Sequence, residues 1–548
     1  MIDRIWKYKF HYIIVLPALL LIFIFKLIPF FRNIVFSFVD YKPFLGLFES
    51  PWVGFGNFKA LFEDTLFRHA LRNTLIINIG FALVAGVIAW LLALALSSIR
   101  IRAVRGAFQT IFLIPYVVPT VFIAGIVMLL LSPAHSPLHL TDKLLLADPL
   151  WTKPILIGIE VFRSLGIPAM IGLAAILSNK TAQSAGKRGR PNAAAAGRAI
   201  AAYLILQLSF LFSSDFELTT ILVNPLIMDS GITIDHYIYT IGLMQANYGL
   251  SSAAGAFVAF IQFILVLLAY QLVRGRFLGD LFSGTKPHID SQSSKHSSKW
   301  WGTAVSAIYA AIVLLFVYLL IIEPFTKKSD SAQLLHDLFS FWNIAGYTIS
   351  NFAAAVVFML VSVTLAYPLT VKKLPGRQLY KLFLLFVLIA ASNQISEYFF
   401  FRELDMVNTL FPQIFTGFFS LASVFVLKSI FNSRHAVLKE QAEASGRGEL
   451  HTFFTLFIPK VWKPLLALGV LQFIALWNAY LPSVIYVVRE ESYSPVAKGL
   501  RLLLSAPENF ADPILWQYCA IISLPPIVLL LIFRKWIISE VLASQVTK

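Results

Sequence analysis

The run YIIVLPALLLIFIFKLIPFFRNIVF, from Tyr12 to Phe36, is an almost unbroken apolar stretch. It has the length that a helix needs to cross the hydrocarbon core of a bilayer. Basic residues precede it, as in a secretory signal, but it is longer than the apolar core of a signal and shows no small-residue cleavage site. We therefore expect a retained first membrane span.

The overall composition also favours a membrane protein. Of the 548 residues, 58% are hydrophobic and only 13% are charged, whereas soluble domains carry about 25% charged residues. The single cysteine, Cys519, excludes a disulfide framework and a cysteine-rich metal site. The net charge of +16 is explained by Lys and Arg in cytoplasmic loops, without any binding of nucleic acid.

Apolar runs of similar length recur along the chain and predict an all-α polytopic membrane protein with about twelve transmembrane helices. Several contain proline, such as Pro115 and Pro119, which membrane helices tolerate where neighbouring groups satisfy the freed backbone. The predicted spans are 11–36, 72–97, 108–132, 153–178, 199–213, 252–273, 301–322, 345–370, 382–396, 408–428, 463–486 and 515–533.

The basic residues predict the orientation. Most of the 44 Lys and Arg residues precede the first span or follow an even-numbered one, and the long loop 213–251 has none. Because basic residues collect in cytoplasmic loops, both termini are expected in the cytoplasm.

A polar, Ser- and Lys-rich stretch at 275–300 indicates a cytoplasmic linker between two halves. The halves, 1–274 and 301–548, each have six predicted spans. Each carries its largest basic loop between its fourth and fifth spans, at about 180–202 and 436–463. This arrangement is typical of a parallel repeat.

The second of these loops contains KEQAEASGRGELHTFFTLFIPKVWKP, from Lys439 to Pro464. Two short helices are expected, broken near Gly446 and Gly448. A small-residue helix at the membrane surface can pack closely against another protein. An ordinary amphipathic connector explains the same pattern.

The loop resembles the EAA motif of permeases from ATP-binding-cassette importers, whose form is E-A-A-x3-G-x9-I-x-L-P. Glu440, Gln441, Ala442, Gly446 and Pro459 stand in that register, with Gln441 in place of the first alanine. The resemblance implies that this loop docks on a cytoplasmic ATPase. Other stretches are similar to maltose-type carbohydrate-uptake permeases, including those that serve polysaccharide fragments: FLIPYVVP (112–119), ILQLSFLFSSDFEL (205–218), VNTLFPQIF (407–415), WNAYLP (477–482) and SLPPIVLL (523–530). Two permease halves fused in one chain are therefore expected.

The corresponding first-half loop, NKTAQSAGKRGRPNAAAAGRAIAA (179–202), departs from the motif. Gln183, Ala185 and Gly189 can be aligned with its start, but the glutamate is missing and Ala202 stands where proline is expected. This implies a weaker docking site. An eroded basic loop at the membrane surface is the alternative. The hypothesis is an asymmetric transporter with one strong and one weak ATPase dock.

Five residues are candidates for the substrate path. The resemblance implies that spans five and eleven help to line it, and the polar residues there are Gln207, Ser209, Trp477, Asn478 and Tyr480. Aromatic faces and amides suit sugar rings. Polar packing between helices is the competing explanation for each residue.

Few charged residues fall within the spans, namely Lys26, Glu160 and Arg163. We interpret Lys26 and Arg163 as interfacial or snorkelling side chains. The scarcity of fixed charge favours a neutral or poorly discriminated solute.

The chain lacks a phosphate-binding loop of the form G-x-x-x-x-G-K-[ST]. We therefore expect no catalytic site, cofactor or metal, and expect separate ATPase subunits to use ATP and Mg²⁺. The resemblance implies as partners an ATPase dimer, an extracellular or periplasmic solute-binding (lipo)protein and membrane lipid, in the plasma (inner) membrane of a bacterium.

Two other functions stay open at this point. A secondary transporter driven by an ion gradient also fits twelve spans in two halves, and it predicts buried acidic or basic relay residues. A membrane sensor that retains the permease fold fits the departure of the first-half loop from the motif.

Overall fold

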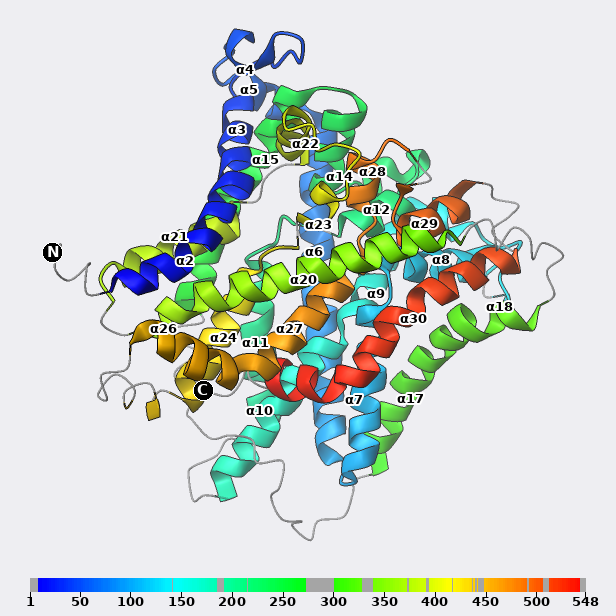
Figure 1. Cartoon of the computed structure of the whole chain (residues 1–548). Coiled ribbons are helices and arrows are strands. Elements are labelled where there is room, and N and C mark those ends of the chain that lie inside the picture. The colour runs from blue at the N-terminus through cyan, green and yellow to red at the C-terminus, as the bar shows by residue number, and fades with distance from the viewer. Residues whose placement is uncertain are drawn as a thin grey trace.

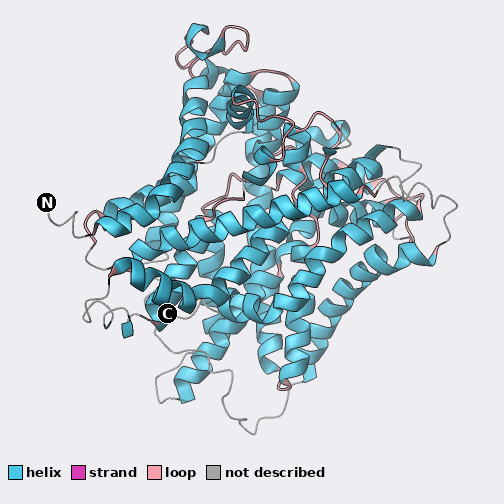
Figure 2. Ribbon diagram, viewed as in Figure 1, coloured by secondary structure: helices cyan, strands magenta, loops and turns pink. Residues whose placement is uncertain are grey.

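The computed structural model describes residues 8–139, 141–184, 192–213, 215–272, 300–327, 339–371, 374–390, 394–415, 417–435, 437–438, 441, 448–489, 492–505 and 512–542. These residues form helices joined by loops, with one isolated bridge between Val39 and Trp52 (Figure 2). The prediction of an all-α membrane protein is confirmed.

Within these described ranges, seven helices are long and apolar enough to cross a membrane (Figure 1). They coincide with the predicted spans one, two, six, seven, eight, eleven and twelve. Their bounds are Lys9–Phe36 (α2, η1 and α3), Thr65–Ser98 (α6), Tyr248–Leu272 (α15), Trp300–Thr326 (α17, η6 and α18), Phe341–Leu369 (α20), Glu449–Asn478 (α26, η7 and α27) and Pro513–Leu542 (α30 and η10).

The predicted third and fourth spans are bent helix pairs. Helices α7 (Arg102–Val117) and α8 (Thr120–Leu131) meet at 92°, and α9 (Pro149–Ser164) and α10 (Gly166–Ser184) meet at 49°. The first bend has a local cause. Pro119 donates no backbone hydrogen bond and pushes Val118 into an extended conformation, so the helix cannot continue through it.

The predicted spans five, nine and ten correspond to shorter helices, so the count of twelve spans stays a prediction. These helices are α11 (Asn192–Leu208), α21 (Arg377–Ile389) and α24 (Leu421–Arg434). The remaining short helices include α4 (Gly46–Glu49), α5 (Gly56–Glu63), α12 (Phe216–Leu222), α13 (Met228–Gly231), α14 (Ile234–Tyr239), α22 (Gln394–Glu403), α23 (Phe411–Phe415), α28 (Leu481–Tyr486) and α29 (Pro495–Ser505).

The first helix of each predicted half packs on the other half. Helix α2 lies along α20, whereas α17 lies along α6 and α7 (Figure 1). Side chains reinforce this exchange: Tyr12 donates to the carbonyl of Pro375 at 3.0 Å, and Arg32 forms two hydrogen bonds with Glu403 at 2.7 and 2.6 Å. The predicted halves therefore interlock.

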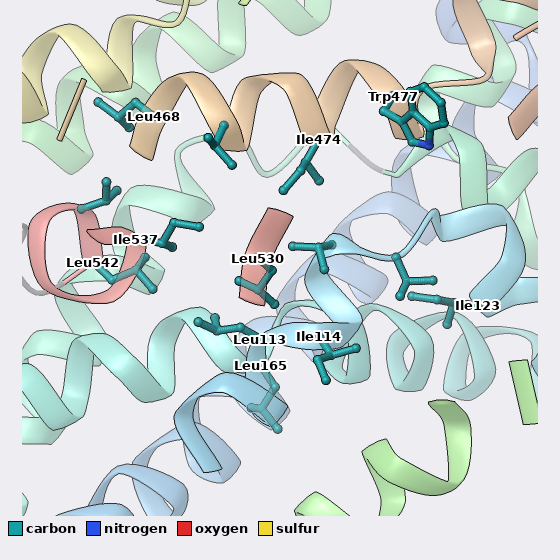
Figure 3. Packing of buried hydrophobic residues seen from close by; sticks show 14 of the residues in the cluster. Leu113, Ile114, Ile123, Leu165, Leu468, Ile474, Trp477, Leu530, Ile537 and Leu542 are labelled. Carbon is teal, nitrogen blue, oxygen red and sulfur yellow. The ribbon is translucent and has the colours of Figure 1, made fainter. Parts of the chain in front are cut away.

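Between them lies one continuous apolar core. Residues from α7, α8, α27 and α30 interdigitate there (Figure 3). They include Leu113, Ile114 and Ile123 on one side, and Leu468, Ile474, Trp477 and Leu530 on the other.

The contacts between span ends agree with the predicted topology. Ends predicted to be cytoplasmic meet one another, and so do ends predicted to lie outside. The cytoplasmic set is Gly302 with Ala95, Thr110 with Arg534, and His11 with Glu449; the outer set is Arg32 with Glu403 and Asp64 with Tyr237. Which side faces the cytoplasm stays a prediction from the basic residues.

We predict that Gly302→Ala destabilises the protein. An added Cβ at Gly302 would lie 2.6 Å from the carbonyl oxygen of Ala95 and would also clash with Ser98. Overpacking of this kind costs about 1–3 kcal/mol. The apparent melting temperature of the solubilised protein should fall.

Gly346→Ala is the matched control. It also lies within a helix, but an added Cβ there meets nothing within 4 Å. Alanine favours a helix over glycine by about 1 kcal/mol, so this variant should melt at or slightly above the wild-type temperature. Equal melting temperatures for the two variants would contradict the close packing of α17 on α6.

Candidate functional site

A polar cavity of ≈ 530 Å³ lies where several helices of the first half break. Its wall comes from α6, α7, α9, the start of α10, α11 and the start of α12. The polar and charged lining residues are Asn78, Tyr116, Glu160, Arg163, Ser164, Tyr203, Gln207, Ser213, Asp215, Glu217 and Thr219.

Arg163 organises one side of the cavity. Its Nη2 lies 3.1 Å from both carboxylate oxygens of Glu160 and 2.7 Å from Asp215 Oδ2. Its Nη1 donates to Thr120 Oγ1 at 3.0 Å. Glu160 and Arg163 share a helix face because they are three residues apart. The guanidinium thus joins α9 to the start of α8 and to the residue that precedes α12.

Asp215 has a second role, because it caps α12. Its Oδ1 accepts a hydrogen bond from the backbone N–H of Leu218 at 3.0 Å. This is the usual way in which an aspartate satisfies the free amides at a helix start. The Asp215 carboxylate therefore both caps the start of α12 and holds the Arg163 guanidinium in position.

The helix breaks of the two predicted halves are closed by side chains from the opposite half. Asn478 Nδ2 donates to the carbonyl of Val117 at 2.8 Å, at the end of α7. Glu217 Oε1 accepts from the backbone N–H of Tyr480 at 3.2 Å, between α27 and α28. Backbone groups freed by a break within a membrane require such partners.

A second cavity of ≈ 270 Å³ lies between the two predicted halves. It shares Tyr116, Ile167 and Tyr203 with the first cavity, so these side chains stand where the two spaces adjoin. The second half contributes mostly apolar groups, with Ser420, Ser423 and Gln472 as polar exceptions.

The predicted substrate-path residues have different surroundings. Gln207 lines the larger cavity and donates to Tyr203 Oη at 2.7 Å. Asn478 and Tyr480 lie at the contact between the halves, and Tyr480 meets Glu217 through its backbone.

Trp477 and Ser209 are engaged in packing. Trp477 is buried and donates to the carbonyl of Ile522 at 3.0 Å, and the Ser209 hydroxyl bonds to Leu206 in its own helix. Neither lines the two cavities described above.

Most polar residues of the cavity were not predicted from the sequence, including two of its three carboxylates, and Arg163 was misinterpreted. Asp215 and Glu217 fall in the predicted outer loop 213–251, yet the structure places them beside Arg163. Their one local signal is an aspartate just before FELTTIL, which is typical of a helix start. Arg163 pairs with Asp215 and Glu160, so it is not a snorkelling side chain. Lys26 lies over the ring of Phe419, at 5.7 Å from its centroid.

The predicted docking loops are described only in part. Gln441 is helical and exposed, and Pro459 lies in the first turn of α27. Gln183 belongs to the last turn of α10. Glu440, Ala442, Gly446, Ala185 and Gly189 lie outside the described residues.

Glu449 stands within the second predicted docking loop, where the chain enters α26 (Glu449–Thr452), a point that we call the loop exit. It is another residue that sequence reasoning missed. Glu449 Oε2 accepts from the Tyr367 hydroxyl at 2.6 Å and lies 3.0 Å from Nε2 of His11, which is buried. Since His11 belongs to α2 and Tyr367 to α20, the loop exit contacts helices of both predicted halves.

We predict that Asn478→Ala destabilises the contact between the halves. The Val117 carbonyl would lose its partner in a poorly hydrated place, at a cost of about 1–3 kcal/mol. The melting temperature of the solubilised chain should fall. Thr348→Ala removes only an exposed bond within one helix and should change little. A wild-type melting temperature for Asn478→Ala would show that the bond to Val117 contributes nothing.

Comparison with known proteins assigns the chain to a family. No protein-family model matches it. It is 30% identical over 294 residues to the polygalacturonan/rhamnogalacturonan transport system permease protein YteP of Bacillus subtilis (strain 168), covering 50% of this chain and 89% of YteP. Protein LplB of the same organism is 27% identical over 283 residues, covering 48% and 89%. The arabinooligosaccharides transport system permease protein AraQ of Halalkalibacterium halodurans is 25% identical over 218 residues, covering 39% and 77%.

Among solved structures, a bacterial ABC transporter involved in the import of the acidic polysaccharide alginate matches with a TM-score of 0.43 and 28% identity, over 50% of this chain and 97% of that one. Because the similarity to YteP extends over nearly the whole of that permease, this chain belongs to the family of ABC transporter permeases.

Proposed function

We propose that the chain is a double permease of an ATP-driven importer that carries an oligosaccharide across the plasma membrane of a bacterium. One observation carries the proposal. YteP is matched over 89% of its length, but this match takes up only 50% of the present chain. The other half has room for a second permease, as the predicted repeat requires, with the linker at 275–300 between them.

The proposed mechanism is alternating access. The larger cavity and the space between the halves adjoin at Tyr116, Ile167 and Tyr203. A solute that moves from one to the other must displace these side chains. Separation of the halves must also break the bonds of Asn478 to Val117 and of Tyr480 to Glu217. ATP binding and hydrolysis by partner subunits would supply the energy.

The chain is proposed to need two kinds of protein partner. It has no phosphate-binding loop, so separate cytoplasmic ATPases would bind ATP and Mg²⁺. A solute-binding protein would deliver the oligosaccharide from outside. Membrane lipid surrounds the spans, and no cofactor of the chain itself is proposed.

Docking is assigned to the two loops found in the sequence. The stronger site has Glu440, Gln441, Ala442, Gly446 and Pro459. The contacts of Glu449 with His11 and Tyr367, which hold the loop exit in place, support this assignment. Movement of this loop would reach α2 and α20 directly. The weaker site has Gln183, Ala185 and Gly189 in the first half.

The same geometry disfavours a proton-driven transporter. Relay carboxylates must gain and lose protons during each cycle, but Glu160 and Asp215 are held by Arg163 at hydrogen-bond distance. A sensor that no longer transports is tested by the first experiment below.

We predict that the reconstituted complex hydrolyses ATP faster when substrate is delivered. The full chain is placed in proteoliposomes with the ATPase and the solute-binding protein of its own bacterium. An oligosaccharide that the binding protein carries, drawn from a panel of neutral and acidic ones, should raise the hydrolysis rate several-fold over binding protein alone, and the labelled sugar should accumulate inside the vesicles. Stimulated hydrolysis without accumulation would favour a sensor, and the absence of both would contradict the importer.

We predict unequal losses from the two docking loops. Glu440→Ala with Gly446→Asp should reduce retention of the ATPase on the immobilised chain by tenfold or more. The pair Gln183→Ala with Gly189→Asp should reduce it less than threefold. Correct insertion of each variant is checked by size-exclusion chromatography. Equal losses would contradict the asymmetry.

A further inference from the structure

The larger cavity carries an unbalanced negative charge. Three carboxylates line it, those of Glu160, Asp215 and Glu217. Among the described lining residues, Arg163 is the only cationic side chain. Burial raises the pKa of Glu217 to about 8. At neutral pH the charged carboxylates of the described wall are therefore Glu160 and Asp215, which exceed the single positive charge of Arg163 by one.

The single cation is already committed to this wall. Arg163 contacts both Glu160 and Asp215, whose side chains are only 20% and 12% exposed. A carboxylate on a ligand would have to compete with two bound carboxylates for the same guanidinium. Displacing either one would leave a charge without its partner in a poorly hydrated place, which is costly.

We propose that this cavity selects uncharged glycan segments and rejects uronates, an inference that rests on the oligosaccharide-importer function proposed above. Like charges repel strongly where water is scarce, and repulsion of the wrong ligand is an effective source of specificity. Among the described lining residues, the one cation that could offset that repulsion, Arg163, is already bonded to two carboxylates.

The remaining groups suit a neutral sugar. Carboxylate oxygens accept hydrogen bonds from sugar hydroxyls, and the hydroxyls of Tyr116 and Tyr203 and the amides of Asn78 and Gln207 donate or accept them. The aromatic rings add apolar surface for the faces of a sugar. A volume of ≈ 530 Å³ lies within the range of about 300–1,000 Å³ that small-molecule sites occupy.

The inferred substrate of this chain differs from the one for which its relative YteP is named. YteP is named for polygalacturonan, a polymer of a sugar acid. Similarity alone would assign an acidic substrate to the present chain. The charge of its own cavity wall favours a neutral one.

The test is a direct binding comparison on the full chain in nanodiscs of neutral lipid. Its ligands are α-1,4-galactotriose and α-1,4-trigalacturonate, which differ only in the oxidation of each C6, with maltotriose as a second neutral probe. Saturation-transfer NMR and titration give the affinity for each. We expect wild type to bind at least one neutral probe tenfold or more tightly than trigalacturonate.

Two charge variants test the origin of this preference. Glu217→Gln keeps an oxygen that can accept from Tyr480, and Glu160→Gln keeps one for Arg163. The double variant should bring the preference for the neutral probe below threefold. The preference of the Glu217→Gln variant should lie between that value and the wild-type preference. Glu63→Gln removes an exposed carboxylate outside the cavity and should keep the wild-type ratio. Gln207→Ala should weaken every probe that binds in the cavity.

The possible outcomes separate the two proposals. Equal affinity of wild type for galactotriose and trigalacturonate would overturn the charge selection and leave the sugar permease intact. A preference that survives in a double variant with a wild-type melting temperature would overturn it as well. If the double variant unfolds, the single Glu160→Gln and Glu217→Gln variants decide, and an undiminished wild-type preference in both would overturn the charge selection. Binding of no probe by wild type would overturn the oligosaccharide function together with the inference.

Discussion

Broken helices within a bilayer must find partners for the backbone groups that they free, because no water is there to bind them. In this chain the partner comes from the opposite half. Asn478 bonds to the carbonyl of Val117, and Glu217 receives the N–H of Tyr480. At each of these two breaks the bonding side chain belongs to the opposite predicted half. The two halves therefore depend on each other at the level of single hydrogen bonds, and the polar cavity lies beside these bonds.

The same constraint explains why charged residues can stand among apolar helices. Arg163 bonds to both Glu160 and Asp215 at 2.7–3.1 Å, and Asp215 also caps α12. An unpaired charge in that place would be expensive, whereas a bonded set holds its geometry. Glu217 lacks a cation of its own and instead bonds to a backbone amide. The charge imbalance of the described wall follows from the sharing of Arg163 between Glu160 and Asp215.

The interlocked first spans provide a mechanical link between the docking loop and both halves. Glu449, at the loop exit, contacts His11 on α2 and Tyr367 on α20. At the other end of the first span, Arg32 donates two hydrogen bonds to Glu403. A displacement of the loop would thus be carried along the first span to the opposite side of the second half. This is a contiguous physical path, and coupling along it is open to measurement.

The sequence by itself determined the all-α membrane class and nine of the spans, two of them bent pairs, because hydropathy and proline act locally. It also determined the family, through short motifs whose spacing survives in a linear string. Tertiary structure alone decided which polar residues form the site. Glu217 and Tyr480 are 263 positions apart, and no local pattern records their contact. From the sequence, Asp215 and Glu217 were expected in an outer loop, and Trp477 was expected along the substrate path. In the structure, Asp215 contacts Arg163, Glu217 lines the same cavity, and the Trp477 indole is buried against Ile522. The physical reason is that a charge becomes functional through the partners around it, and those partners are chosen by the fold.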